Sequence, residues 1–291
     1  MSRTESWQVR KVAASLGAEV LNADLSETSV EEADFIEELL IKYKVLFFPR
    51  QKITVDQHVE LGSHFGVIES HPNLNNPYTE HDKVFELAAS KGGIADEWHT
   101  DLTFMKEPSI MSVLHMVTCP EVGGDTMWTN LCQAYEELSE PMKDLCESIT
   151  ALHDALPHNR TDKMMVHPVI RVHPETGQKT LYVNEHFTRR IVEMNASESE
   201  MLLSYLTRWV QNPRFTVRYG WTAGTIGIWD NRCTQHMVLN DFEGERIIHR
   251  VTIMGDKPVG IIAPKYKPWA RVGNKSATTR QDRQLKSYYR Q

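Results

Sequence analysis

Apolar residues recur with the spacing of a helix face in four segments of the chain. The clearest follows Ser29-Val30-Glu31-Glu32, a capping box in which the serine hydroxyl and the Glu32 carboxylate accept free amide N–H groups at a helix start. The apolar positions behind it are Ala33, Ile36, Leu40 and Tyr43. Similar patterns predict helices from Thr54 to about Gly66, from Leu131 to Leu152, and from Ser197-Glu198-Ser199-Glu200 to just before Pro213.

Apolar and β-branched runs predict strands between these helices. Val45-Leu46-Phe47-Phe48-Pro49 is typical of a buried strand. Five further segments have strand character: Ile110–Val117, Leu181–Asn184, Phe215–Tyr219, Thr225–Trp229 and Ile247–Met254. Because strands and helices do not alternate as βαβ units do, the pattern favours an α+β fold, an antiparallel jelly roll with flanking helices.

Charge is unevenly distributed along the 291 residues. We expect one domain over residues 1–264, with a net charge of −14, and a tail over residues 265–291, with a net charge of +7. The overall charge of −7 argues against a general nucleic-acid binder. We interpret the tail as a peripheral arm that packs on an acidic neighbouring subunit or on nothing, with nucleic acid as the less favoured alternative.

Other features of the sequence bear on the compartment. No apolar stretch approaches the roughly 20 residues that cross a bilayer, and the polar start MSRTESWQVRKV lacks the apolar core of a signal peptide. The four cysteines have neither paired nor C-x-x-C spacing, so neither a disulfide framework nor a structural zinc site is indicated. We therefore expect a cytoplasmic protein that does not associate with membranes.

The candidate chemistry starts at Glu97-Trp98-His99-Thr100-Asp101. In an extended chain, side chains two residues apart leave the same face, so His99 and Asp101 can converge on one divalent cation. A third residue strengthens the interpretation as a metal site. A predicted strand from Gly227 to Asp230 leads to a turn from which His236 can supply a second imidazole. Two histidines and one carboxylate leave three positions of an octahedral ion open, as in non-haem Fe(II) oxygenases.

Two arginines follow on the next predicted strand. Arg246 and Arg250 share one face of that strand with Ile248. A buried guanidinium without a partner is costly, so both arginines need anions. Because the planar guanidinium matches the fork of a carboxylate, this face is expected to bind anionic ligands.

With these residues, the chain resembles the TauD/TfdA family of Fe(II)- and 2-oxoglutarate-dependent dioxygenases, and it is nearer to the taurine dioxygenase and alkylsulfatase branch than to the phenoxyacetate branch. The similarity runs from about Leu16 to Pro258. The matching motifs are Phe47-Phe48-Pro49, Trp98-His99-Thr100-Asp101, Gly123-Gly124-Asp125-Thr126, Val183-Asn184-Glu185, Trp229-Asp230-Asn231-Arg232 and His249-Arg250-Val251-Thr252-Ile253-Met254-Gly255-Asp256.

The resemblance implies a double-stranded β-helix and a set of functional residues. It implies that the catalytic iron ligands are His99, Asp101 and His236. Arg246 and Thr126 would hold the distal carboxylate of the co-substrate 2-oxoglutarate, which chelates the iron and leaves a position for O2. Trp229 is either near the metal or a core aromatic. Family members commonly form homodimers or homotetramers.

The resemblance also implies substrate residues. Arg250 matches an arginine that binds the substrate sulfonate and His71 a histidine that assists it; the alternatives are a structural ion pair and a surface loop position. Phe187 lines the substrate pocket or packs in the core. Leu74 and Ala95 stand where taurine-specific members carry a tyrosine and an asparagine, which argues against taurine. An alkyl sulfonate or alkyl sulfate ester fits better; its hydroxylation gives succinate, CO2, an aldehyde and sulfite or sulfate.

Four other functions stay open. The same chemistry on an aryloxyalkanoic or other carboxylic acid would need only a different anion. Demethylation of a nucleobase is supported by the basic tail alone and opposed by the charge of the remaining chain. A zinc hydrolase would leave Arg246 and Thr126 without a role. A non-catalytic binding module would not need all three metal ligands.

Overall fold

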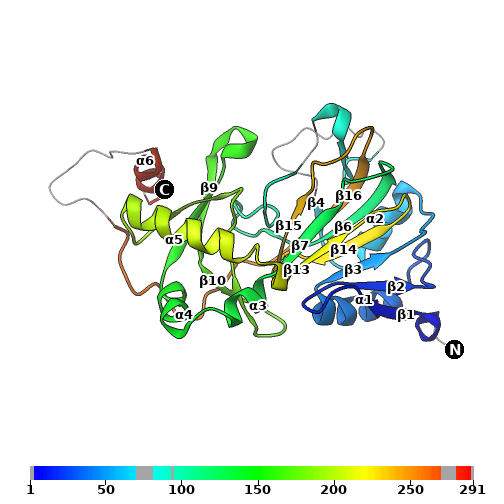
Figure 1. Ribbon diagram of the computed structural model, residues 1–291, viewed down its shortest axis with the longest axis horizontal. Coiled ribbons are helices and arrows are strands. Elements are labelled where there is room, and N and C mark those ends of the chain that lie inside the picture. The colour runs from blue at the N-terminus through cyan, green and yellow to red at the C-terminus, as the bar shows by residue number, and fades with distance from the viewer. Residues whose placement is uncertain (1–2, 70–80, 93–94, 270–279, 290–291) are drawn as a thin grey trace. The chain divides into compact units, whose positions relative to one another are not determined.

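The computed structural model describes residues 3–69, 81–92, 95–269 and 280–289 (Figure 1). The chain forms two compact units whose segments alternate along the sequence. The first unit comprises residues 1–101, 109–130 and 213–256, and the second comprises residues 102–108, 131–212 and 257–291. The organisation of residues 1–264 as a single domain stays a prediction.

An eight-stranded sheet dominates the first unit. Its strand order is β1-β2-β3-β14-β6-β16-β4, with β5 also paired to β16. Every pair is antiparallel except β2 with β3. In chain order the strands are β1 (Gln8–Lys11), β2 (Ala18–Leu21), β3 (Val45–Phe48), β4 (Ile68–Glu69), β5 (Phe85–Ala88), β6 (Ser109–Thr118), β14 (Ile226–Asp230) and β16 (Ile247–Met254).

A second, three-stranded sheet packs on this one. It has the order β13-β7-β15, formed by β13 (Thr216–Tyr219), β7 (Thr126–Asn130) and β15 (Thr234–Val238). Strand β3 shows how the layers are built. Val45 and Phe47 pack with Trp128 of the small sheet, whereas Leu46 and Phe48 belong to the opposite cluster. Because both faces of β3 are covered, all four of its residues are apolar. The two packed sheets agree with the predicted jelly-roll class, a double-stranded β-helix, which is confirmed.

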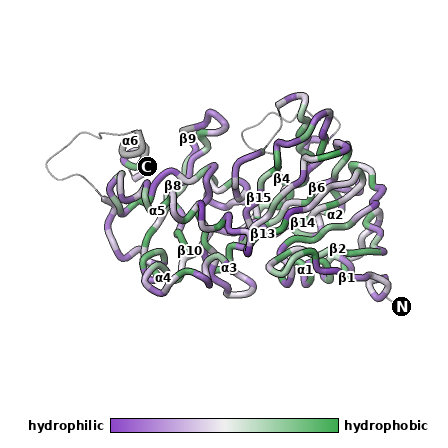
Figure 2. The backbone as a smooth tube through the Cα atoms, viewed as in Figure 1, coloured by the Kyte–Doolittle hydropathy of each residue, from purple (hydrophilic) through white to green (hydrophobic). Residues whose placement is uncertain are grey.

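Two helices of the first unit cover the other face of the large sheet. They are α1 (Val30–Tyr43) and α2 (Val55–Ser63). Both begin with complete capping boxes, at Ser29 and at Thr54, as the sequence predicts. Ile36 and Leu40 of α1 and Leu61 of α2 pack with β-strand residues in one core cluster. Hydrophobic residues run along the strands of this unit in Figure 2.

The described part of the second unit contains two smaller sheets and four α-helices. Its sheets have the orders β12-β8-β9 and β10-β11. The strands are β8 (Thr150–Ala155), β9 (Arg160–Pro168), β10 (Ile170–Val172), β11 (Lys179–Leu181) and β12 (Thr188–Ile191). The helices are α3 (Leu131–Glu136), α4 (Glu140–Glu147), α5 (Ala196–Trp209) and α6 (Arg280–Tyr288). Four short 3-10 helices complete the described part of the chain: Arg3–Ser6, Ala89–Lys91, Leu156–His158 and Pro213–Phe215.

The predicted helix from Leu131 to Leu152 is wrong in this unit. The segment forms α3 and α4, and it then enters strand β8. Ser139 stands at the N-cap of α4, with a proline in the first turn, so a new helix starts there. All six residues of β8 are buried, and the strand pairs with β9 and β12. Pairing on both sides therefore overrides the helical spacing of its apolar residues.

Two other boundaries differ from the prediction. Helix α5 is capped by Asn195, whose side chain accepts the N–H of Glu198 in a capping box, and not by Ser197. Asparagine is among the best N-cap residues, so the earlier cap is the one used. Strand β11 ends at Leu181; the predicted strand end at Asn184 is wrong, because that side chain accepts the Phe187 N–H in a local turn.

The C-terminal tail contributes a helix to the second unit. Leu285 of α6 is buried with Leu152 and Val192.

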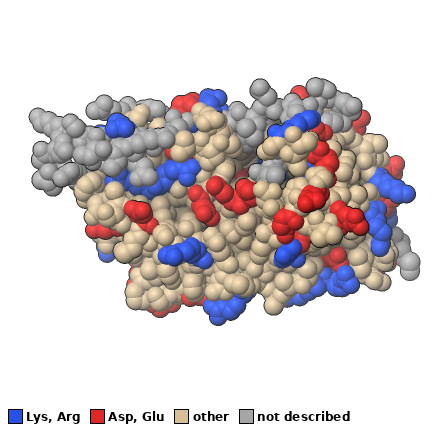
Figure 3. Space-filling model, turned by 45° about the horizontal axis from the view of Figure 1, so that its top comes forward, with Lys and Arg blue, Asp and Glu red and all other residues tan. Residues whose placement is uncertain are grey.

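On the face in Figure 3, the described Lys and Arg side chains lie among Asp and Glu side chains. None of the helices in the described ranges is both long and apolar enough to span a bilayer.

Candidate active site

Two histidines of the first unit are brought together by backbone pairing. His99 and His236 form an isolated antiparallel bridge, in which the N–H of each residue donates to the carbonyl of the other at 3.1 and 2.8 Å. Their ring centroids lie 4.2 Å apart. The bridge explains how residues that are far apart in sequence present imidazoles to the same point.

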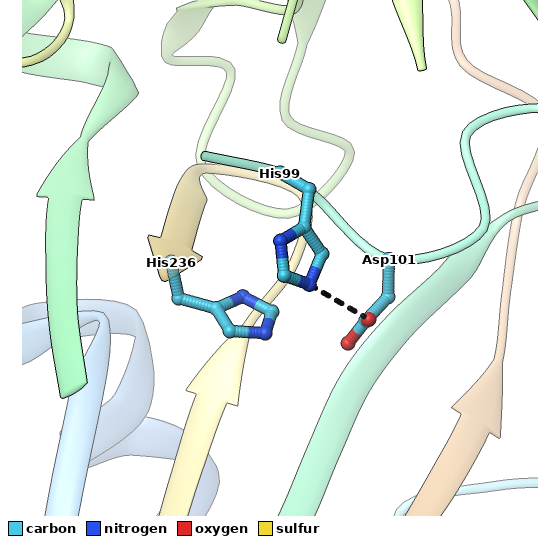
Figure 4. Close-up of side chains that lie close together, drawn as sticks. All are labelled: His99, Asp101 and His236. Atoms are coloured by element: carbon cyan, nitrogen blue, oxygen red, sulfur yellow. Dashed lines mark ion pairs between the residues drawn. The ribbon is translucent and has the colours of Figure 1, made fainter. Parts of the chain in front are cut away.

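Asp101 completes this group (Figure 4). Its Oδ1 lies 3.7 Å from Nε2 of His99. One ligand atom from each of His99, Asp101 and His236 lies within 4.8 Å of the others, and all three residues are buried. The spacing of His99 and Asp101 therefore works as predicted, with both side chains turned to His236.

The turn before His236 is built by Asp230. Its carboxylate accepts both the backbone N–H and the guanidinium of Arg232, and its carbonyl accepts the hydroxyl of Thr234 at 2.7 Å. These hydrogen bonds stabilise the turn between β14 and β15. His236 itself lies within strand β15, so the expectation that it sits on the turn is wrong by a few residues.

The protonation states suit a divalent cation. Nδ1 of His99 lies 2.7 Å from the Glu97 carbonyl oxygen, so Nδ1 carries the proton in this hydrogen bond. The lone pair of Nε2 is then available to coordinate a metal ion. Burial, with His99 beside it, lowers the pKa of His236 far below its ordinary value. Burial opposes ionisation of Asp101, but Arg250 and the histidines outweigh it and hold the pKa of Asp101 well below its usual range. Two imidazoles and one carboxylate fit Fe(II).

A second group, around Arg246 and Thr126, lines the same cavity as His236. Arg246 donates through Nε to the Gly124 carbonyl at 3.1 Å and through Nη2 to the Thr126 hydroxyl oxygen at 3.4 Å. Trp221 also donates its indole N–H to Thr126, at 2.8 Å. Burial lowers the pKa of Arg246 to about 10, so it is charged at neutral pH. Since Thr126 accepts twice, its own O–H is available to an incoming acceptor.

Glycines shape the turn that carries this group. Gly123 and Gly124 both have a positive φ. A Cβ on Gly123 would lie 2.5 Å from the Asp241 carbonyl oxygen, and one on Gly124 would lie 3.3 Å from Cδ of Arg246. The Gly123-Gly124 motif is therefore needed for the close approach of backbone and guanidinium.

Arg250 has contacts with the first group and lines the cavity that both groups border. It lines this cavity together with Ile248 of the same strand and with Arg246, which directly precedes β16, so the three side chains lie on one side as predicted. Its Nη1 donates to Oδ1 of Asp101 at 3.0 Å. Among the described residues, its buried Nε has no hydrogen-bond partner. The side chain is thus both an ion-pair partner of Asp101 and a source of an unused donor in the cavity.

The rest of the cavity is mainly apolar. Its apolar lining comes from Leu87, Ala95, Leu114, Trp128, Trp229, Val238 and Ile248. Trp229 lies with its ring centroid 4.7 Å from that of His236 and is also part of the buried core, so both interpretations of this residue hold.

The described lining of this cavity does not include the other two predicted substrate residues. His71 falls outside the described residues, as does Leu74. Phe187 belongs to the second unit, where it is buried and packs edge to face against Phe104. Their roles in substrate binding stay predictions.

Three contributors to the site were not assigned by sequence reasoning. Ser112 donates to Asp101, Asn231 donates to Ser112, and Trp221 donates to Thr126. Asn231 lies in the Trp229-Asp230-Asn231-Arg232 motif, which could have drawn attention to it. Ser112 depends on the register that sets it opposite Trp229, and Trp221 lies in the loop between β13 and β14. Neither residue carries a local signal of its own.

Comparison with known proteins agrees with this geometry. Residues 8–252 match the model of the family described as taurine catabolism dioxygenase TauD, TfdA family. An alkylsulfatase of Acinetobacter baylyi is 37% identical over 91% of this chain and 90% of its own. An alpha-ketoglutarate-dependent sulfate ester dioxygenase of Pseudomonas putida is 35% identical over 87% and 91%.

A solved structure extends the agreement to the fold. The crystal structure of a taurine dioxygenase from Burkholderia xenovorans superposes with a TM-score of 0.81 at 37% sequence identity, covering 88% of this chain and 92% of that one. The resemblance inferred from the motifs is confirmed over nearly the whole chain. This protein belongs to the TauD/TfdA family of 2-oxoglutarate-dependent non-haem iron dioxygenases.

Proposed function

We propose that this dioxygenase hydroxylates an alkyl sulfate ester or an alkyl sulfonate at the carbon that carries the sulfur group. The observation that carries the proposal is the placement of two buried arginines, Arg246 and Arg250, in one cavity beside the His99, Asp101 and His236 cluster. One arginine serves the co-substrate and the other serves the substrate.

His99, Asp101 and His236 would hold Fe(II) and leave three coordination positions for ligands. Bound iron with 2-oxoglutarate and O2 supplies the oxidation: the 2-oxo acid is decarboxylated to succinate and CO2, and one oxygen atom enters a substrate C–H bond. The protein binds and orients both organic anions and keeps bulk water from the buried site.

Arg246 and Thr126 bind the distal carboxylate of 2-oxoglutarate. Arg246 is fixed by the Gly124 carbonyl, and the Thr126 hydroxyl already accepts from Trp221 and Arg246. Its proton is therefore directed to a carboxylate oxygen, while the guanidinium supplies charge.

Arg250 binds the anionic head of the substrate. Its unpartnered Nε is a buried donor, and an anion in the cavity would satisfy it. Ala95 lines the same cavity and presents only a methyl group, so the wall suits an alkyl chain better than an ammonium group. The named activities of the Acinetobacter and Pseudomonas relatives are consistent with such substrates.

Product release follows from the position of hydroxylation. In an alkyl sulfate, the oxidised carbon carries both the new hydroxyl and the sulfate oxygen. Loss of the hydroxyl proton forms the C=O bond of an aldehyde, and the C–O bond to sulfate breaks with its electron pair. A sulfonate releases sulfite by the same rearrangement.

The remaining assignments belong to the same proposal. His71 assists Arg250, and Phe187 lines the substrate pocket. The protein acts in the cytoplasm as a homodimer or homotetramer. The free state of all four cysteines supports a reducing compartment, and the family resemblance supports self-association. Light scattering on a size-exclusion column measures the mass of the assembly.

A substrate panel tests the function. Purified enzyme is loaded with Fe(II) and supplied with 2-oxoglutarate, O2 and one candidate anion, and succinate and inorganic sulfate or sulfite are measured. We expect hexyl sulfate or hexanesulfonate to drive succinate release together with sulfate or sulfite, and taurine to be a poor substrate. Succinate release with phenoxyacetate and none with the sulfur anions would show that the site acts on carboxylates instead.

A further inference from the structure

A chain of buried hydrogen bonds leads from Trp229 to the carboxylate of Asp101. Trp229 Nε1 donates to Asn231 Oδ1 at 3.0 Å. Asn231 Nδ2 donates to Ser109 Oγ at 3.1 Å and to Ser112 Oγ at 3.0 Å. Ser112 Oγ donates to Asp101 Oδ2 at 3.0 Å. All five residues are buried, so water does not compete for these groups.

The direction of each bond in this chain is fixed. An indole N–H can only donate, so the atom of Asn231 that faces Trp229 is the amide oxygen. The amide nitrogen then faces the two serines. Because Ser112 accepts this N–H, its own proton is left for Asp101, whose ionised carboxylate only accepts. The amide of Asn231 thus determines which way the Ser112 hydroxyl points.

Asp101 is held by two donors that act on different oxygens. Ser112 on β6 binds Oδ2, and Arg250 on the adjacent β16 binds Oδ1. Strand β6 lies between β14 and β16, so both donors are placed by the central strands of the sheet. Oδ1 is also the oxygen that lies 3.7 Å from Nε2 of His99, so it faces the metal ligands. Ser112 is therefore the donor that keeps the second oxygen, Oδ2, turned away from them.

We propose that Ser112, directed by Asn231, is a positioning residue that keeps Asp101 bound to iron through a single oxygen. This inference rests on the proposed function. A carboxylate that turned both oxygens to the ion would take a fourth coordination position, and only two would remain for 2-oxoglutarate and O2, which need three. Ser112 would therefore keep the third coordination position of the iron open, and it would do so without contacting the substrate or the co-substrate.

The chain offers a matched control. Ser109 lies on the same strand, is equally buried, and accepts from the same Asn231 nitrogen, but the donor to Asp101 Oδ2 is Ser112. Ser109→Ala and Ser112→Ala each replace one buried hydroxyl by a methyl group next to Asn231. Only Ser112→Ala removes the donor to the metal ligand.

The experiment measures metal binding without turnover. Co(II) alone is titrated into the metal-free wild type and both variants, and affinity and the visible d–d spectrum are recorded. The affinity of the Fe(II) enzyme for 2-oxoglutarate is then measured anaerobically from its charge-transfer band. We expect Ser112→Ala to lose roughly tenfold or more in Co(II) affinity, to change its d–d spectrum, and to bind 2-oxoglutarate more weakly, whereas Ser109→Ala matches the wild type.

The outcomes separate this inference from the proposed function. If the wild type binds Co(II) and 2-oxoglutarate but Ser112→Ala and Ser109→Ala behave alike, the positioning role is wrong and the oxygenase stands. If the wild type binds neither, the proposed function is wrong. Should Ser112→Ala fail to fold, Ser112→Cys keeps a side chain of similar shape with a weak donor, and the same spectral change, smaller in size, is required.

Discussion

At the scale of single residues, the two arginines of the cavity differ in what holds them. Arg246 is tied to the Gly124 carbonyl and Thr126, so its guanidinium is fixed where a carboxylate can meet both it and the threonine hydroxyl. Arg250 is tied to Asp101 by one nitrogen and keeps a second donor unused among the described residues. The two side chains line one cavity but have different partners.

Alanine variants separate these two roles. Arg246→Ala removes a charged hydrogen bond, worth roughly 1.5–3 kcal/mol, and we expect the Kd of 2-oxoglutarate to rise by about tenfold to a hundredfold. Arg250→Ala is expected to leave that Kd nearly unchanged and to raise the KM for the alkyl sulfate. Anaerobic titration of the charge-transfer band gives the first constant and steady-state kinetics the second. Loss of the band in Arg250→Ala would contradict the assignment.

Functional residues could be predicted from the sequence where their spacing alone places them on one face of the chain. His99 and Asp101 were predictable because an extended chain places them on one face, and the arginines because alternate positions of a strand share a face. Ser112 was not predictable in this way. A serine has no preferred function, and its bond to Asp101 exists only because strand pairing sets it opposite Trp229 and next to Arg250's strand.

At the scale of elements, the site depends on how strands and turns meet. The turn at Gly123 brings the chain against the Asp241 carbonyl, and Gly124 then offers its own carbonyl to Arg246. The β14 to β15 turn is closed by the Asp230 and Arg232 pair, and the bridge between His99 and His236 fixes the ligands. Each turn thus places one ligand group.

A glycine pair tests the first turn. Gly123 and Gly244 both have a positive φ, but a Cβ meets the Asp241 oxygen at 2.5 Å in the first case and nothing within 4 Å in the second. We expect Gly244→Ala to cost about 1–2 kcal/mol of stability through its backbone conformation alone. Gly123→Ala should cost more and also weaken 2-oxoglutarate binding. Urea unfolding and the anaerobic titration measure both effects; equal costs would argue against the close approach.

Helix α2 contains a histidine that makes stability depend on pH. His58 is buried with a ring nitrogen 3.0 Å from the Val113 carbonyl. Burial, with His115 and His249 nearby, lowers the pKa of His58 to about 3. Its ordinary pKa is near 6.5, so the unfolded chain binds the proton first, and stability present above pH 6.5 is lost as the pH falls toward 3.

The variant His58→Gln removes this dependence. Glutamine keeps an N–H for the Val113 carbonyl but does not titrate. We expect the wild type to lose up to about 1.4 kcal/mol more than the variant for each pH unit below 6.5. Urea unfolding at pH 7 and pH 5 measures the difference. Parallel losses in both proteins would show that His58 is not held neutral in the fold.

Elements with a local signal were predicted well, and those defined by distant partners were not. The capping boxes at Ser29 and Thr54 start helices as expected, because the cap and the first turn are adjacent in sequence. Residues 150–155 look helical in spacing but form β8, since β9 and β12 pair with both of its edges. Such pairing cannot be read from a single segment.

At the scale of the whole molecule, ligand binding and folding are linked. An ion that binds only the folded chain stabilises it by an amount that grows with the ratio of its concentration to its Kd, about 2.7 kcal/mol at a hundredfold excess. We expect Mn(II) to raise the Tm of the metal-free wild type by several degrees and to leave Asp101→Ala unchanged. Calorimetry with and without EDTA measures this; an equal rise in both proteins would place the ion elsewhere.

The central claim is that His99, Asp101 and His236 hold one Fe(II) that still has room to chelate 2-oxoglutarate. The most direct measurement is an anaerobic titration of the metal-free protein with Fe(II) and then 2-oxoglutarate, followed by visible absorption. The account predicts a weak charge-transfer band that saturates at one iron per chain in the wild type and is absent in His236→Ala. A wild type without the band, or a band that survives in His236→Ala, would contradict it.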